Sequence, residues 1–133
     1  MFFLDTNTCI YFLNGRYESV RERLLATPPG EVGVPAVVKA ELLFGAFKSR
    51  LRVENSRKVE QFLEPFQVIA FCGNAAREYA EIRQASESSG RIVGPNDLLI
   101  AATTRYHNAV LVTHNTSEFS RVPNLQIQDW VIH

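Results

Sequence analysis

Short apolar runs alternate with longer amphipathic stretches along the whole chain, and this alternation restricts the fold more than any other feature. Runs predicted to form strands cover residues 2–4, 32–34, 66–71, 109–113 and 125–128. Most of them are continuously apolar instead of alternating with polar residues, which is typical of parallel strands buried on both faces. Strands that alternate with helices predict an α/β protein, in which helices cover both faces of a central, mostly parallel sheet of four to five strands.

The stretches between these runs have the spacing of helices. Helices are predicted over residues 9–13, 19–26, 74–88 and 97–106, with one more that begins near residue 36 and one that ends near residue 63. The helix that begins near residue 36 carries an apolar stripe that should face the core, formed by Ala36, Ala40, Leu43, Phe44 and Phe47. Turns or loops are expected over residues 5–8, 91–96 and 114–120.

The composition excludes several classes of protein. With 133 residues, 46% of them hydrophobic, the chain is long enough for one domain with a sizeable core, so residues 1–133 are expected to form a single domain. Fourteen Lys and Arg residues balance fourteen Asp and Glu residues, which excludes a strongly basic protein that coats nucleic acid but allows a local basic patch. Two cysteines are too few for a disulfide framework, and no apolar run approaches the ~20 residues of a membrane span. We therefore expect a cytoplasmic protein without a signal peptide or membrane segment.

Four acidic residues lie where a parallel sheet places ligands, beyond the carboxyl ends of its strands. Asp5 follows the first strand directly, Asp97 opens an apolar helix, and Glu118 lies in the loop after the strongest strand. Glu41 is in the middle of a helix, and Gly45 one turn later leaves open space on that face. Such carboxylates, gathered at one sheet edge, would suit Mg²⁺ or Mn²⁺, since these ions prefer oxygen ligands. Two ions about 4 Å apart can activate a water and stabilise the leaving oxygen of a phosphodiester.

Each of these acids also has an ordinary structural explanation. Asp5 and Asp97 could cap the helices that follow them by accepting a backbone N–H. Glu41 could be a solvated residue of a helix surface, and Glu118 a surface acid of a loop. Only the joint arrangement of all four points to a site, so the hypothesis of a metal site that acts on phosphodiesters depends on folding bringing them together.

Four segments of the chain match a known family in combination. They are Leu4-Asp5-Thr6-Asn7, Glu41-Leu42 with Gly45, Ile92-Val93-Gly94-Pro95-Asn96-Asp97, and Val112-Thr113-His114-Asn115 with Glu118-Phe119. In these motifs the chain resembles the PIN-domain family, and most closely the VapC-type toxins of bacterial toxin–antitoxin pairs. The resemblance covers essentially the whole chain and implies a single PIN domain with a three-layer α/β/α fold.

The resemblance implies an endoribonuclease that depends on Mg²⁺ or Mn²⁺, with Asp5, Glu41 and Asp97 as the principal metal-binding and catalytic carboxylates. Many relatives have an Asp in the loop after the fourth strand, where this chain has Asn115. Either Glu118 supplies the missing charge as a fourth catalytic acid, or Asn115 binds metal or water through its carbonyl.

Other residues are candidates for orienting the site or for binding RNA. Asn7 and Thr113 match polar positions of the family near the site, where they would orient Asp5 or a water by hydrogen bonds. Because phosphate contacts dominate nucleic-acid affinity, the candidates for RNA binding are the bases Arg16, Lys48, Arg50, Arg52, Arg91 and Arg105, with His114 in the site loop. His107 and His133 are scattered and are not expected to be catalytic.

The resemblance also implies partners and a substrate. We expect a cognate VapB-like antitoxin whose C-terminal segment lies across the acidic groove, a homodimer, and a toxin–antitoxin hetero-oligomer. The expected substrate is RNA, with the anticodon region of initiator tRNA as the suggested target, and the basic segment 48–58 is expected to contact RNA or antitoxin. Four aromatic side chains are either core residues or an exposed patch for association: Tyr11, Phe12, Phe44 and Phe47.

Three other functions remain open on the sequence alone. A non-catalytic PIN scaffold would bind partners without cutting RNA, and a DNA-directed nuclease would share the same fold. A phosphoacceptor regulatory domain also has a parallel sheet and an acidic pocket. However, Asp5 stands alone after the first strand, and residues 109–113 contain neither the Asp nor the Lys that such a domain uses.

Overall fold

The computed structural model describes residues 1–132 and has a sheet of five strands at its centre, with every neighbouring pair parallel. The strands are β1 (Phe2–Leu4), β2 (Val32–Pro35), β3 (Gln67–Ile69), β4 (Val110–Val112) and β5 (Gln126–Gln128). Their order in the sheet is β3-β2-β1-β4-β5, so the chain adds strands on one side of β1 and then on the other. The order therefore reverses between β1 and β4, which is where ligands bind in open parallel sheets.

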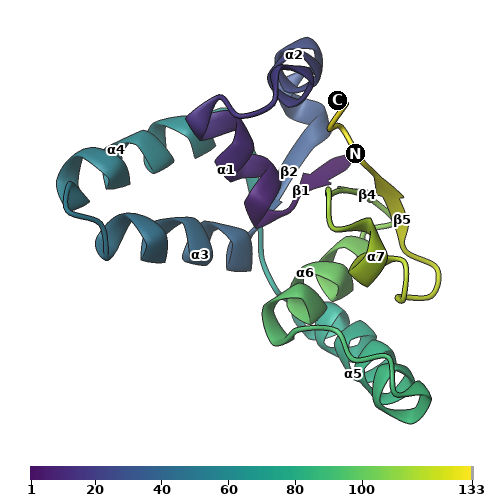
Figure 1. The fold of residues 1–133 in the computed structure, drawn as a ribbon. Coiled ribbons are helices and arrows are strands. Elements are labelled where there is room, and N and C mark those ends of the chain that lie inside the picture. The colour runs from purple at the N-terminus through teal and green to yellow at the C-terminus, as the bar shows by residue number, and fades with distance from the viewer. Residues whose placement is uncertain (133) are drawn as a thin grey trace.

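Helices flank this sheet, as the sequence predicts. They are α1 (Thr6–Asn14), α2 (Glu18–Ala26), α3 (Ala36–Phe47), α4 (Arg52–Leu63), α5 (Gly73–Ser89), α6 (Pro95–Tyr106) and α7 (Thr116–Phe119), with a 3₁₀ turn over Pro29–Glu31. In Figure 1, α3 and α4 form a hairpin that projects from one side of the sheet, while α5 and α6 pack together on another. Within residues 1–132 no helix is long and apolar enough to cross a membrane.

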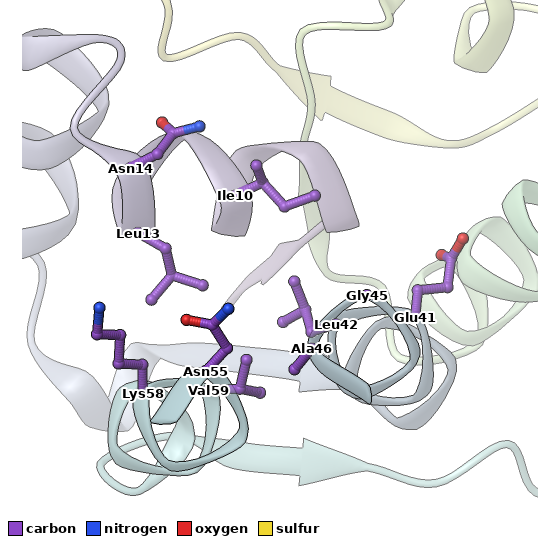
Figure 2. A pocket seen from close by; sticks show the side chains of 10 residues that line it. All are labelled: Ile10, Leu13, Asn14, Glu41, Leu42, Gly45, Ala46, Asn55, Lys58 and Val59. Carbon is purple, nitrogen blue, oxygen red and sulfur yellow. The ribbon is translucent and has the colours of Figure 1, made fainter. Parts of the chain in front are cut away.

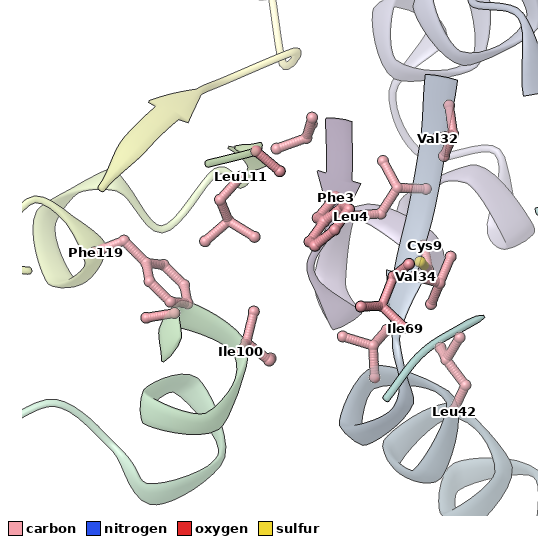
Figure 3. Packing of buried hydrophobic residues seen from close by; sticks show 14 of the residues in the cluster. Phe3, Leu4, Cys9, Val32, Val34, Leu42, Ile69, Ile100, Leu111 and Phe119 are labelled. Atoms are coloured by element: carbon pink, nitrogen blue, oxygen red, sulfur yellow. The ribbon is translucent and has the colours of Figure 1, made fainter. Parts of the chain in front are cut away.

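The core explains why the three central strands, β2, β1 and β4, contain no polar residues. Phe3 and Leu4 of β1 are buried together with Val34 of β2 and Leu111 of β4, and Figure 3 shows them packed between the sheet and its helices. The contact between β1 and β2 is so close that a Cβ atom on Gly33 would lie 2.8 Å from Cε1 of Phe3. The ring of Phe3 thus occupies the space that a side chain at position 33 would need.

Two predicted helix boundaries were wrong for the same reason. Residues 6–8 were expected to form a turn, but they are the first turn of α1, because Asp5 caps the helix and accepts a 2.8 Å hydrogen bond from the backbone N–H of Thr8. Likewise, α6 begins at Pro95 instead of Asp97, and its N-cap is Gly94. The expected loop after β4 contains the short helix α7. Polar and proline-rich sequences look like loops, although they also favour the first turn of a helix.

The predicted apolar stripe of α3 was wrong. The buried face is Val38, Leu42 and Ala46, whereas Phe44 is 64% exposed and Phe47 is 45% exposed. Since α3 is apolar on nearly all sides, its sequence pattern does not select one face, and packing against α1 and α4 does. Phe44 and Phe47 are therefore part of an exposed patch and not of the core.

Candidate active site

Asp5 lies at the point where the strand order reverses. Its backbone N–H donates to the carbonyl of Val112, 3.2 Å away, which ties the end of β1 to the end of β4. Its side chain is only 4% exposed and accepts hydrogen bonds from Thr8 and from the buried Thr113. Asp5 is therefore both the cap of α1 and a buried carboxylate at the carboxyl edge of the sheet, so its two predicted roles are compatible.

Glu41 joins three helices at this edge. One of its oxygens, Oε1, accepts a 2.6 Å hydrogen bond from the hydroxyl of Thr6 on α1. The other, Oε2, accepts a 3.2 Å hydrogen bond from Nδ2 of Asn96 on α6. The side chain is half-buried and held at both oxygens, so it is not a freely solvated residue of α3.

Glu118 on α7 is held beside Asp97 on α6. The backbone N–H of Gly94 donates to Oε1 of Glu118, and Nδ2 of Asn115 donates to Oε2, each at 2.7 Å. A Cβ atom at position 94 would lie 3.4 Å from that Oε1, an ordinary van der Waals distance, so the contact comes from the backbone N–H of Gly94 and does not require glycine. Glu118 itself brings a fourth carboxylate to the site, and the amide of Asn115 orients it. Asp97 lies in the first turn of α6 and does not cap it.

The four acids share one electrostatic environment. Burial, together with the charges of Glu118, Asp5 and Glu41, raises the pKa of Asp97 from 3.8 to about 7. Burial also raises the pKa of Asp5, with a contribution from Glu41, although hydrogen bonds from Thr113 and Thr8 oppose this. Burial acts to raise the pKa of Glu118, but its hydrogen bonds from Gly94, Asn115 and Asp97 outweigh this and leave the pKa lowered.

Such mutual repulsion is what a divalent cation relieves, and the donor chemistry fits Mg²⁺ or Mn²⁺. Within residues 1–132, no three His, Cys, Asp or Glu side chains are already arranged to hold one ion. Mg²⁺ commonly binds through one or two carboxylates and keeps several waters. An ion shared by Asp5, Glu41 and Asp97 would therefore be held in part through water molecules.

Several site residues that the sequence analysis did not single out belong to these networks. Thr6 and Asn96 hold Glu41, and the backbone of Gly94 holds Glu118. All three lie inside the matched motifs, next to the acids, which was the available signal. The hydroxyl of Thr113, which is hydrogen-bonded to Asp5, also accepts a 3.0 Å hydrogen bond from the backbone N–H of Asn115. Asn7 is exposed on the first turn of α1.

The candidate RNA-binding bases are in different environments. Arg105 is held by Glu78 and Glu81 and by the carbonyl of Pro123, and its side chain is only 12% exposed. This ion-pair network ties α6 to α5, so Arg105 has a structural role that does not depend on RNA. Four other bases, namely Arg16, Lys48, Arg50 and Arg91, are exposed. Arg52 is also exposed, and its guanidinium lies 4.2 Å from the ring centroid of Phe47.

His114 is part of the loop after β4, and its Nδ1 lies 2.8 Å from Oδ2 of Asp129. His133 lies outside the described residues.

An apolar groove of about 360 Å³ opens beside the acids, between α1, α3 and α4. Its walls include Ile10 and Leu13 of α1 and Leu42 of α3. Figure 2 shows Glu41 at one end of the groove and Lys58 at the other. The groove is thus lined mainly by apolar side chains and ends at one of the four carboxylates.

The comparisons with known proteins agree with this geometry. The PIN domain family matches residues 2–125. Ribonuclease VapC2 of Rickettsia felis is 37% identical over 98% of both chains. The tRNA(fMet)-specific endonuclease VapC of Shigella flexneri is 37% identical over 97% of both. Among solved structures, DNA-bound VapBC from Salmonella typhimurium superimposes with a TM-score of 0.92, at 35% identity and covering 97% of each chain.

Proposed function

This chain belongs to the PIN domain family, and from that premise we propose that it is the toxin of a type II toxin–antitoxin pair and a metal-dependent endoribonuclease. The observation that carries the proposal is the group of four carboxylates from different elements in one electrostatic environment: Asp5, Glu41, Asp97 and Glu118. A non-catalytic scaffold would not need to maintain such repulsion. The reaction is hydrolysis of an RNA phosphodiester that leaves 5′-phosphate and 3′-hydroxyl ends.

Asp5, Glu41 and Asp97 would hold Mg²⁺ or Mn²⁺. When bound, such an ion activates the attacking water and offsets the charge that develops on the phosphate. The chain's own residues prepare the site for it. Thr6 and Asn96 fix the carboxylate of Glu41. A bound cation would lower the raised pKa of Asp97 and so favour its charged form.

The substrate is RNA, and the relative from Shigella flexneri, named for its specificity for tRNA(fMet), supports tRNA as the class. The exposed bases Arg16, Lys48, Arg50 and Arg91 would bind its phosphates. They are needed because the acids alone repel the RNA backbone. A protein with these partners acts in the cytoplasm.

A VapB-like antitoxin is the partner, as in the VapBC complexes that resemble this structure. The groove between α1, α3 and α4 would take the apolar side chains of an antitoxin segment, and a cation of that segment would pair with Glu41 at its end. The exposed rings of Phe44 and Phe47 supply further apolar surface for a homodimer or hetero-oligomer.

Incubation of the purified protein with total tRNA tests the proposal. Cleavage is expected with Mn²⁺ or Mg²⁺ and not with EDTA, and sequencing of the ends should locate the cut. The substitutions Asp97→Asn and Glu41→Gln should abolish cleavage, whereas Glu22→Gln, an exposed acid on α2, should not. Intact RNA with the unmodified protein and metal would favour a scaffold, and cleavage of DNA alone would favour a DNA-directed nuclease.

A further inference from the structure

A cluster of aromatic and cationic side chains lies next to the acids and takes no part in holding them. Tyr11 on α1 and Tyr17 before α2 meet edge to face, with ring centroids 4.8 Å apart. The guanidinium of Arg16 lies 5.7 Å from the centroid of Tyr11 and 5.2 Å from that of Tyr17. The ring of His114 lies 6.3 Å and 6.0 Å from the same two rings. Three chain segments thus bring four planar groups together, and we call them the planar cluster.

The planar cluster is held in place but partly open to solvent. Tyr11 and Tyr17 are partly buried against the core, and Arg16 is exposed. The side chain of His114 is 37% exposed, and its contact with Asp129 fixes the plane of its ring. Among residues 1–132, no carboxylate forms an ion pair with Arg16. Its guanidinium is therefore oriented by the two rings and keeps its hydrogen-bonding edge for a ligand.

The planar cluster is positioned directly by the elements that carry Asp5. His114 follows Thr113, which is hydrogen-bonded to Asp5. Tyr11 lies one turn of α1 beyond Thr8, whose backbone also binds Asp5. Six residues of helix rise about 9 Å, so Tyr11 is roughly that far along the helix axis from Asp5. A polynucleotide with one phosphate at the acids would have a neighbouring nucleotide within reach of these rings.

We propose that the planar cluster of Tyr11, Arg16, Tyr17 and His114 is a stacking site for one unpaired base of the RNA substrate. The inference rests on the proposed ribonuclease function and specifies how that site selects its substrate. Proteins recognise unpaired RNA by stacking its bases on aromatic rings and on the guanidinium plane of Arg. A site for phosphate alone would need the charge of Arg16 but not the rings around it.

Binding of an RNA stem-loop in EDTA tests this inference, because the RNA then stays intact. The dissociation constant is measured for the loop and for versions in which each loop nucleotide in turn lacks its base. Removal of one particular base should raise the dissociation constant of the unmodified protein about tenfold. This is within the range for one stacked base. In Arg16→Ala and in Tyr11→Leu, removal of the same base should hardly change the dissociation constant further. The substitution and the removal of the base disrupt the same contact, so their effects are not additive.

The controls separate stacking from charge and from misfolding. Arg83→Ala on α5 removes an exposed arginine elsewhere and should retain the full base dependence. Thermal unfolding checks each variant, and Arg16→Ala, which changes an exposed side chain, keeps the test valid if Tyr11→Leu does not fold. Equal weakening of intact and base-free RNA in Arg16→Ala would overturn the proposal, because that is the result of a charge effect. The proposal would also be overturned if removal of no base weakened binding by the unmodified protein.

A parallel reaction of the unmodified protein with the same RNA and Mn²⁺ keeps the two proposals distinct. RNA that is cut without base-dependent binding overturns the stacking site alone. RNA that binds through one base but is never cut with metal overturns the nuclease function and leaves a binding site.

Discussion

Replacement of Asp97 by Asn should stabilise the metal-free protein at pH 8. Burial and the charges of Glu118, Asp5 and Glu41 raise the pKa of Asp97 from 3.8 to about 7. The folded state therefore holds its proton more tightly than the unfolded state does. Between about pH 4 and pH 7 the folded chain binds more protons, so the free energy of unfolding falls as the pH rises through this range. The amide of Asn does not ionise, so the free energy of unfolding of Asp97→Asn does not fall in this way.

The size of the effect follows from the pKa shift. Three pH units correspond to about 4 kcal/mol at 1.36 kcal/mol per unit. Asp97 is only half-buried and shares its proton with Glu118, so screening by solvent reduces this, and we expect about 1–2 kcal/mol at pH 8. At pH 5, where the carboxyl of Asp97 is still protonated in the folded state, the gain should be less than half as large.

Urea unfolding in EDTA measures the effect. With a typical slope of about 1–3 kcal/mol per molar urea, the midpoint of Asp97→Asn should rise by roughly 0.5–1 M at pH 8. Glu22→Gln, a change to an exposed acid on α2, should leave the midpoint nearly unchanged. A midpoint for Asp97→Asn that equals or falls below that of the unmodified protein at pH 8 would refute the electrostatic reasoning.

Three more substitutions test particular contacts. Thr6→Val removes the 2.6 Å hydrogen bond to Glu41 and should lower the cleavage rate about three- to tenfold, with rescue by Thr6→Ser and little change in stability. Gly33→Ala places a Cβ atom 2.8 Å from Phe3 and should cost about 1–3 kcal/mol in urea unfolding, whereas a neutral result would mean that the strands separate easily. Arg105→Ala breaks the ion pairs between α6 and α5 and should cost about 1–3 kcal/mol while tRNA binding persists. Loss of binding at unchanged stability would instead identify Arg105 as a substrate contact.

The order of strands and helices could be predicted from the sequence because the apolar runs are distinct. Phe2–Leu4 and Val110–Val112 are short, continuously apolar and each followed by a polar residue, and both are strands of the sheet. The first turns of α1 and α6 could not be predicted as helical. Their sequences contain Thr, Asn and Pro, which are common both in loops and at helix starts, and the capping contacts that decide between these are local details of the folded chain.

The candidate site was predictable only in part. The positions of Asp5 and Glu118 after strands indicated the correct edge of the sheet. The partners of Glu41 come from positions 6 and 96, and contacts across 35 and 55 residues leave no periodic signal. In α3, the exposed Phe44 could not be distinguished from a core residue, because the helix has apolar side chains on nearly every face.

Titration of Mn²⁺ into the protein without RNA tests the claim that one cation site gathers these carboxylates. Electron paramagnetic resonance of the unbound Mn²⁺ gives the affinity directly and does not depend on cleavage. We predict saturable binding by the unmodified protein and by Glu22→Gln, with at least tenfold weaker binding by Asp5→Asn and by Asp97→Asn. Equal affinity in all four proteins would contradict the existence of this site.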